Sequence, residues 1–329
     1  MTPQAFRDAL DGAKNRGNGL ILIAAHCRPD GDAVSSVSAT AGILRDAGYN
    51  AVGILPEPVP DACVPFIPEE YIIRSAAGVQ PELFVIVDCS NPERIAADGF
   101  VPACPVINID HHPDNSQKAD LSLVRPECCA TAEVLYHFFV DCGFSISPEN
   151  ATRLLLGIMT DSGCFRFDNT SPEALESAAA LIRLGADRHT IVLEAFLNRD
   201  ENLVRLEADL LNNGLHTAFN GKAAWFVLTK ALLARYSVDV RNTENLIDAV
   251  RNIRGVEFAA LLREEPGGYK LSLRSKNAPY SAGRVARRLN GGGHEMAAGG
   301  FIPAATAEEA GEILTSQIQL ESLLATATQ

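Results

Sequence analysis

In the stretch Val106-Ile107-Asn108-Ile109-Asp110-His111-His112-Pro113, a short apolar run ends in one carboxylate and two imidazoles. Proline and turn-forming residues follow at once, which is typical of a buried strand whose carboxyl end carries polar groups to a site. Adjacent side chains on extended backbone point to opposite faces, so His111 and His112 are expected to have different roles. One imidazole can bind a metal while the other faces a substrate, and Asp110 is available to orient a ring.

Three further apolar segments end in groups of the same chemistry. The residues concerned are His26, Asp30, Asp32, Asp88 and Asp161. Gly31 is expected to allow a tight turn that brings the first three of these groups close together. Each group also has a plainer explanation, because an Asp before a helix is a common cap and a buried Asp can be a hydrogen-bonded core residue.

Strands and helices alternate through the first half of the chain. Strands are predicted at 19–25, 51–55, 83–87, 106–109 and 121–124, with the last at an edge. Helices are predicted at 4–14, 34–47, 130–141, 148–160 and 172–184. This order favours an α/β fold with a doubly wound, mainly parallel sheet, whose strands present their carboxyl ends at one edge. We therefore expect the His and Asp groups to converge there.

The length of 329 residues exceeds the size at which a single core usually keeps growing, so two domains are expected. We predict a metal-binding catalytic domain at 1–189, a helical connector at 190–219 and a smaller substrate-binding α/β domain at 220–329. The last domain is predicted to have a mixed sheet, with a hairpin formed by 256–263 and 269–274. The active site is expected in the cleft between the two domains.

The composition is that of an ordinary globular protein, with 47% hydrophobic and 21% charged residues. No stretch approaches the roughly 20 apolar residues of a membrane span, and the N-terminus lacks a signal-peptide pattern, so a cytoplasmic protein is expected. The eight cysteines form no C-x-x-C pair and are predicted to be reduced thiols.

The net charge of −13 is unevenly distributed. Residues 1–219 carry 15 Lys and Arg against 30 Asp and Glu, whereas residues 220–329 carry 13 against 11. Long duplex nucleic acid needs many cationic phosphate contacts, so an acidic chain of this kind is a poor partner for it. An acidic half that holds cations and a locally basic patch suit a small anionic substrate.

Histidine and carboxylate ligands without thiolates suit Mn²⁺ better than structural zinc. Six candidate ligands are too many for one catalytic ion with open positions, so two ions bridged by a carboxylate are expected. In the second half, Arg274 could bind a phosphate, and the glycines before His294 could offer backbone N–H groups to an anion. Alternatively, Arg274 is an ordinary surface residue and the glycines before His294 form a flexible loop. The arginines at 284, 287 and 288 are predicted to lie on a solvated helix face.

In this order, the motifs resemble those of the DHH phosphoesterase family. His26-x-x-x-Asp30-Gly31-Asp32-Ala33 is similar to its first motif, Asp88 to the second, Asp110-His111-His112 to the third and Asp161 to the fourth. Gly291-Gly292-Gly293-His294 is similar to the signature of the C-terminal domain associated with the family. The length resembles the oligoribonuclease and pAp phosphatase branch.

The resemblance implies roles for these residues. One Mn²⁺ would be bound by His26, Asp30 and Asp88, and the other by Asp32, Asp88, His111 and Asp161. His112, with Asp110, would be catalytic and contact the scissile phosphate. The nucleotide would be bound by Arg274, Ser275, Gly292, Gly293 and His294. A homodimer is also implied.

Two substrate classes stay open. The first is short oligoribonucleotides, including pApA, together with 3′-phosphoadenosine 5′-phosphate (pAp). The second is a cyclic dinucleotide such as cyclic di-AMP. A non-catalytic nucleotide-binding module is a third interpretation, and it would require a broken ligand set. None of the six metal positions is broken.

Overall fold

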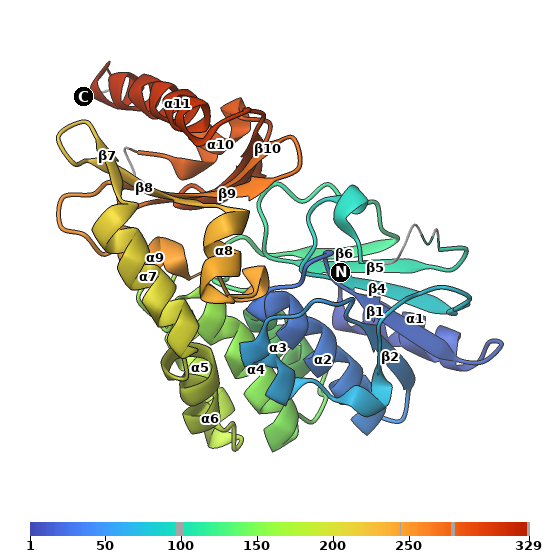
Figure 1. The fold of residues 1–329 in the computed structure, drawn as a ribbon. Coiled ribbons are helices and arrows are strands. Elements are labelled where there is room, and N and C mark those ends of the chain that lie inside the picture. Colours follow the sequence, from blue (N-terminus) through green and yellow to red (C-terminus); the bar gives the residue numbers. More distant parts are fainter. Residues whose placement is uncertain (97–99, 101, 244, 278–279, 328–329) are drawn as a thin grey trace. The chain divides into compact units, whose positions relative to one another are not determined.

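The computed structural model describes the chain except for residues 97–99, 101, 244, 278–279 and 328–329 and the side chains of 322–327. The chain divides into two compact units, Met1–Asn198 and Arg199–Gln329 (Figure 1). The boundary falls inside the predicted connector, and the predicted division at 189 and 219 stays a prediction. No helix in the described part of the chain is long and apolar enough to cross a membrane.

The first unit is built on a six-stranded sheet with the order β3-β2-β1-β4-β5-β6. Its strands are β1 (Leu20–Ala24), β2 (Asn50–Ile54), β3 (Ile72–Ile73), β4 (Leu83–Val87), β5 (Val106–Asp110) and β6 (Leu121–Val124). All neighbouring pairs are parallel. From β1 the chain winds first to one side and then to the other, which confirms the predicted doubly wound α/β fold. The edge position of β6 is also confirmed, whereas β3 is too short to leave a sequence pattern.

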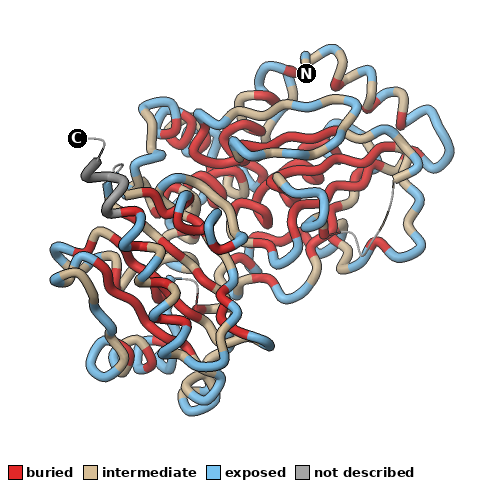
Figure 2. Tube along the Cα trace, turned by 90° about the horizontal axis from the view of Figure 1, so that it is seen from above, coloured by how far each residue is buried: buried red, intermediate tan, exposed pale blue. Residues whose placement is uncertain are grey.

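Helices cover one face of this sheet. The helices of this unit are α1 (Pro3–Lys14), α2 (Gly31–Asp46), α3 (Thr131–Asp141), α4 (Pro148–Asp161), α5 (Pro172–Arg183) and α6 (Arg188–Val192), of which α5 and α6 pack against α4. Figure 1 shows α2, α3 and α4 side by side, and their apolar side chains share one core with Ile21, Ile23 and Val85. On the other face, Leu22 and Phe84 pack with residues of connecting segments. Burial from both sides explains why these strands are continuous apolar runs (Figure 2).

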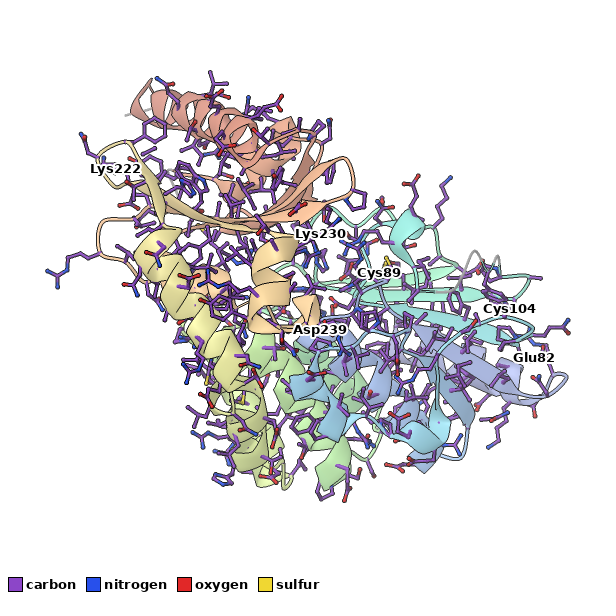
Figure 3. The ribbon with its side chains drawn as sticks, in the orientation of Figure 1. Glu82, Cys89, Cys104, Lys222, Lys230 and Asp239 are labelled. Carbon is purple, nitrogen blue, oxygen red and sulfur yellow. The ribbon has the colours of Figure 1, made fainter. Side chains whose placement is uncertain are left out.

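The parallel arrangement places the ends of the strands at two opposite edges. Glu82 directly precedes β4, and Cys104 lies just before β5. Figure 3 shows both residues at one edge. Cys89, which follows β4, lies at the opposite edge. Groups that follow β1, β4 and β5 therefore meet at the edge of Cys89, as the sequence predicted.

The second unit has a mixed sheet with the order β11-β12-β10-β9-β8-β7. Its strands are β7 (His216–Ala218), β8 (Ala223–Leu228), β9 (Phe258–Glu265), β10 (Gly268–Ser275), β11 (Gly292–Gly293) and β12 (Ala297–Ile302). Its helices are α7 (Glu201–Asn213), α8 (Lys230–Tyr236), α9 (Leu246–Arg251), α10 (Ala282–Arg288) and α11 (Ala307–Ala327). The antiparallel β9–β10 pair confirms the predicted hairpin, and the parallel β8–β9 pair makes the sheet mixed.

Gly157 allows three helices of the first unit to meet closely. A Cβ atom at this position of α4 would lie 2.6 Å from both Asp32 Oδ1 on α2 and Ala132 Cβ on α3, and 2.7 Å from Ser35 Oγ. The backbone N–H of Gly157 donates to Ser35 Oγ at 3.1 Å. A hydrogen at position 157 thus permits α2 to lie directly against α4.

We predict that Gly157→Ala destabilises the protein by about 1–3 kcal/mol, because the added methyl group overpacks a buried helix contact. Urea unfolding followed by circular dichroism measures the change. Gly12→Ala is the matched control, because Gly12 lies in α1 and a Cβ atom added there would have nothing within 4 Å. The control is expected to gain about 0.5–1 kcal/mol. Equal stability of Gly157→Ala and wild type would contradict the prediction.

Candidate active site

The structure brings all six predicted metal-binding residues together in the first unit. Each is delivered by the end of a secondary-structure element. These are His26 after β1, Asp30 and Asp32 at the start of α2, Asp88 after β4, His111 after β5 and Asp161 at the end of α4. Among the described residues, the groups that could hold a metal in this unit combine histidine with aspartate and contain no cysteine.

One such group consists of His26, Asp30 and Asp88. The Nε2 atom of His26 lies 3.7 Å from Asp30 Oδ2 and 3.7 Å from Asp88 Oδ2. These distances are too long for hydrogen bonds but suit ligands that share one ion. The Nδ1 atom of the same ring lies 3.1 Å from the carbonyl of Cys27, which favours the tautomer with a lone pair on Nε2.

A second group consists of Asp32, Asp88 and His111, with Asp161 beside it. His111 Nε2 lies 3.8 Å from Asp88 Oδ1 and 3.4 Å from Asp161 Oδ2. The carbonyl of Cys128 lies 3.3 Å from His111 Nδ1. As in His26, this contact favours the tautomer with a lone pair on Nε2. Asp88 thus presents one oxygen to each group, as a bridging carboxylate would.

Gly31 in the first motif has a different structural role from the predicted one. Asp30 is the N-cap of α2 and accepts from Ala33 N at 3.0 Å, so its capping role coexists with its place beside His26. Gly31 begins α2, and a Cβ there would lie 2.5 Å from the Thr160 side chain. Its lack of a side chain therefore serves close contact with α4 and does not create a tight turn.

Asp110 and His112 form a hydrogen-bonded pair beside Asp88, and the three residues are a further group that could hold a metal. His112 Nδ1 donates to Asp110 Oδ1 at 2.8 Å, and Asn115 Nδ2 donates to Asp110 Oδ2 at 2.5 Å. Burial would raise the pKa of Asp110, but its bonds with His112 and Asn115 outweigh burial and hold that pKa below its ordinary value. Asp110 is therefore an ionised carboxylate that orients His112, whose side chain is 24% exposed.

Protonation of the other groups reflects the crowding of negative charge. Burial would lower the pKa of His26, but Asp30 and Asp88 raise it to about 9, and Asp110 and Asp88 do the same for His112. Burial and neighbouring carboxylates raise the pKa of Asp32 to about 8 and that of Asp88 to about 6. The centre therefore retains protons near neutral pH that a bound divalent cation would displace.

The first turn of α3 also belongs to the site, although the motifs in the sequence did not indicate it. The backbone N–H groups of Thr131 and Ala132 donate to Asp32 at 2.7 and 3.0 Å, and the Thr131 hydroxyl donates to Asp88 at 2.9 Å. One signal was present, because Ala130 occupies the N-cap of a strongly apolar helix. A helix start without a capping side chain indicates that another part of the chain supplies the acceptor.

In the second unit, the predicted substrate-binding residues lie on β10 and on the loop that contains β11. Arg274 pairs with Ala297 of β12 in the sheet register. Ser275 is fully buried, and its hydroxyl lies 3.4 Å from the carbonyl of Glu295, so it holds the loop beside His294. Gly292 and Gly293 pair with β12. Contact of these residues with a substrate stays a prediction.

The arginines of α10 at 284, 287 and 288 are exposed, which agrees with the predicted solvated helix face, and they are also ion-paired. Arg284 and Arg287 lie 3.4 and 3.2 Å from the carboxylate of Glu295. Arg284 and Arg288 also bind Glu321 of α11, which is fully buried. A separation of more than 30 residues hid the pairs with Glu321 from the sequence. The cluster fixes the loop that carries His294.

The comparisons with known proteins agree with this geometry. Residues 20–158 match the DHH family, N-terminal domain, and residues 226–320 match the DHHA1 domain. The protein named bifunctional oligoribonuclease and PAP phosphatase NrnA from Thermus thermophilus is 30% identical over 92% of this chain and 90% of its own length. The chain belongs to the DHH family, and with it to the metal-dependent hydrolases.

Two solved structures share the fold. An exopolyphosphatase-related protein from Bacteroides fragilis has a TM-score of 0.86 at 24% identity, covering 98% of this chain and 97% of its own. RecJ from Thermus thermophilus, solved in complex with Mn²⁺, has a TM-score of 0.54 at 15% identity, covering 98% of this chain and 55% of its own. Both confirm the α/β architecture.

We predict that Mn²⁺ stabilises the protein more strongly as pH rises from 6.5 to 9. In this range the metal-free folded state binds more protons than the unfolded state, because His26 and His112 have pKa values of about 9 against 6.5 and Asp32 has a pKa of about 8 against 3.8. Metal-free stability therefore falls as pH rises. Asp30 and His111, whose pKa values are lowered, contribute with opposite sign only below pH 6.5.

Differential scanning calorimetry with and without Mn²⁺ measures this effect as a Tm difference. The difference is expected to widen with pH. Parallel Tm curves across the range would contradict the assignment of His26 and Asp32 to a cation site.

Proposed function

We propose that the protein is a two-metal phosphoesterase that hydrolyses short oligoribonucleotides, including pApA, to nucleoside monophosphates and removes a phosphate from pAp. The names of its relatives support this activity. The main support for two metal ions is the position of Asp88. Its two oxygens face His26 Nε2 and His111 Nε2 at 3.7 and 3.8 Å.

The donor set fits two divalent cations. We assign His26, Asp30 and Asp88 to one ion and Asp32, Asp88, His111 and Asp161 to the other. Mn²⁺ is the proposed metal, because imidazole and carboxylate ligands without thiolates suit it. When bound, the two ions supply Lewis-acid activation of the attacking water and of the phosphate.

His112 is the proposed electrostatic catalyst. Its Nδ1 proton is directed at Asp110, and this contact with an ionised carboxylate favours the protonated ring. A proton held at Nε2 can donate to a phosphoryl oxygen as negative charge develops there. Asp110 acts by fixing the ring and stabilising its positive charge.

The loop of the second unit is the proposed site for the part of the nucleotide that does not react. Arg274 would bind a phosphate, and Gly292, Gly293 and His294 would contact the nucleotide. The charge distribution supports a short substrate, because the chain has a net charge of −13 and seven basic residues between Arg263 and Arg288. Dimerisation stays a prediction.

Turnover of a substrate panel with Mn²⁺ tests the proposal. The panel contains pApA, a five-nucleotide RNA, pAp, cyclic di-AMP and inorganic pyrophosphate. Wild type is expected to cleave the linear RNAs and pAp, and Asp88→Ala is expected to abolish turnover because both ions lose a ligand. Preference for cyclic di-AMP would move the protein to cyclic dinucleotide turnover. Absence of Asp88-dependent turnover would exclude the two-metal mechanism.

Asp110→Asn tests the role of the Asp110–His112 pair. The substitution keeps the shape but removes the charge that raises the pKa of His112. We expect kcat to fall about 10²-fold or more, the upper pH limit of activity to move to lower pH, and Mn²⁺ affinity to stay unchanged. Loss of Mn²⁺ binding with an unaltered pH profile would instead identify Asp110 as a metal ligand.

A further inference from the structure

The start of α3 is held by a carboxylate from another helix. Ala130 at the N-cap has extended backbone and offers no side-chain acceptor. Its place is taken by Asp32 of α2, whose Oδ2 accepts from Thr131 N at 2.7 Å and whose Oδ1 accepts from Ala132 N at 3.0 Å. In the same turn, Glu133 accepts from Cys129 N at 2.7 Å. The backbone of this turn is therefore fixed from two sides.

Thr131 is the first residue of α3, and its side chain is fully buried. Its hydroxyl lies 2.9 Å from Asp88 Oδ1 and 3.4 Å from Asp110 Oδ1. A hydroxyl has one proton, so the shorter distance assigns the bond to Asp88. Within a helix a threonine commonly bonds to a carbonyl of the preceding turn, but no such helical carbonyl precedes the first residue.

The carboxylate plane of Asp88 needs an external contact to be fixed. Rotation about the bond that joins a carboxylate to its Cβ has a broad minimum, so the side chain alone does not define where its oxygens point. The ring nitrogens of His26, His111 and His112 lie 3.7–3.8 Å from the Asp88 oxygens, which is beyond hydrogen-bond distance. The Thr131 hydroxyl lies within that distance.

We propose that Thr131 is a positioning residue that fixes the orientation of Asp88, so that one oxygen faces each proposed metal group. This inference rests on the proposed function, because it concerns the proposed bridging ligand. The hydroxyl uses one lone pair of Oδ1 and leaves the other for a metal. Asp32 accepts the hydrogen bonds of the turn that contains Thr131. The same turn of α3 therefore contacts two proposed ligands, Asp32 and Asp88.

Two matched pairs of variants at position 131 test the role of the hydroxyl. Thr131→Val replaces the hydroxyl by a methyl group of similar shape. Thr131→Ser and Thr131→Ala both lack the methyl group and differ from each other only in the hydroxyl. Mn²⁺ affinity of the full chain, measured by electron paramagnetic resonance without substrate, is expected to fall about 10–100-fold in the Val and Ala variants and to be retained in the Ser variant.

A second measurement separates positioning from structural damage. If Thr131 acts through Asp88, the Mn²⁺ concentration for half-maximal pAp hydrolysis rises in the Ala variant, and saturating Mn²⁺ restores most of kcat. Thr40→Val is the control, because Thr40 is a buried threonine of α2 whose hydroxyl has no hydrogen-bond partner among the described residues. It is expected to bind Mn²⁺ as wild type does.

The outcomes separate this inference from the proposed function. If wild type binds no Mn²⁺, the two-metal proposal fails and the role of Thr131 fails with it. If wild type binds Mn²⁺ and the Ala variant equals the Ser variant, only the role of Thr131 is overturned. If the Val variant does not fold, the Ser and Ala pair decides the question alone.

Discussion

The structure depends on how three carboxylates are kept within a few ångströms of one another and away from water. Asp32, Asp88 and Asp110 are 1%, 2% and 0% exposed. Hydrogen bonds from His112 and Asn115 lower the pKa of Asp110, whereas the pKa values of Asp32 and Asp88 stay raised. The protein thus stabilises the charge of one carboxylate by itself, whereas a bound cation would favour the ionised form of the other two. Those two are the ones that we propose as metal ligands.

The fold supplies this arrangement from rigid elements. Parallel strands bring His26, Asp88 and the 110–112 segment to one edge, and two helix ends add Asp32 and Asp161. Asp88 has a positive φ of 50°, which an Asp adopts at a local energetic cost. The backbone N–H of Asp88 donates to the carbonyl of Ile109 at 3.1 Å, and the side chain is buried, so the backbone and the side chain of this residue are both held. Much of the packing in the first unit therefore serves to place a few oxygen and nitrogen atoms.

The sequence predicted the sheet and the six candidate ligands because their signals are local. An apolar run that ends in Asp or His contains both the strand and the group it delivers. The contacts of Thr131 with Asp32 and of Arg284 with Glu321 join residues 99 and 37 positions apart, and no local pattern records them. The two-residue strands β3 and β11 were missed for a related reason, since pairing with a neighbour defines them.

The order of residues in the third motif gives its two histidines different hydrogen-bond partners. Residues two positions apart lie on the same side of a strand, and Asp110 and His112 are indeed paired at 2.8 Å. Both imidazole rings lie beside Asp88 Oδ1 and are 4.5 Å apart, but His111 also directs its Nε2 to Asp161, at 3.4 Å. A carboxylate followed by two histidines at a strand end therefore produces one imidazole oriented by that carboxylate and one imidazole directed at Asp161 and the second group. Exchanging Asp110 with His111 would keep the composition and lose this division of roles.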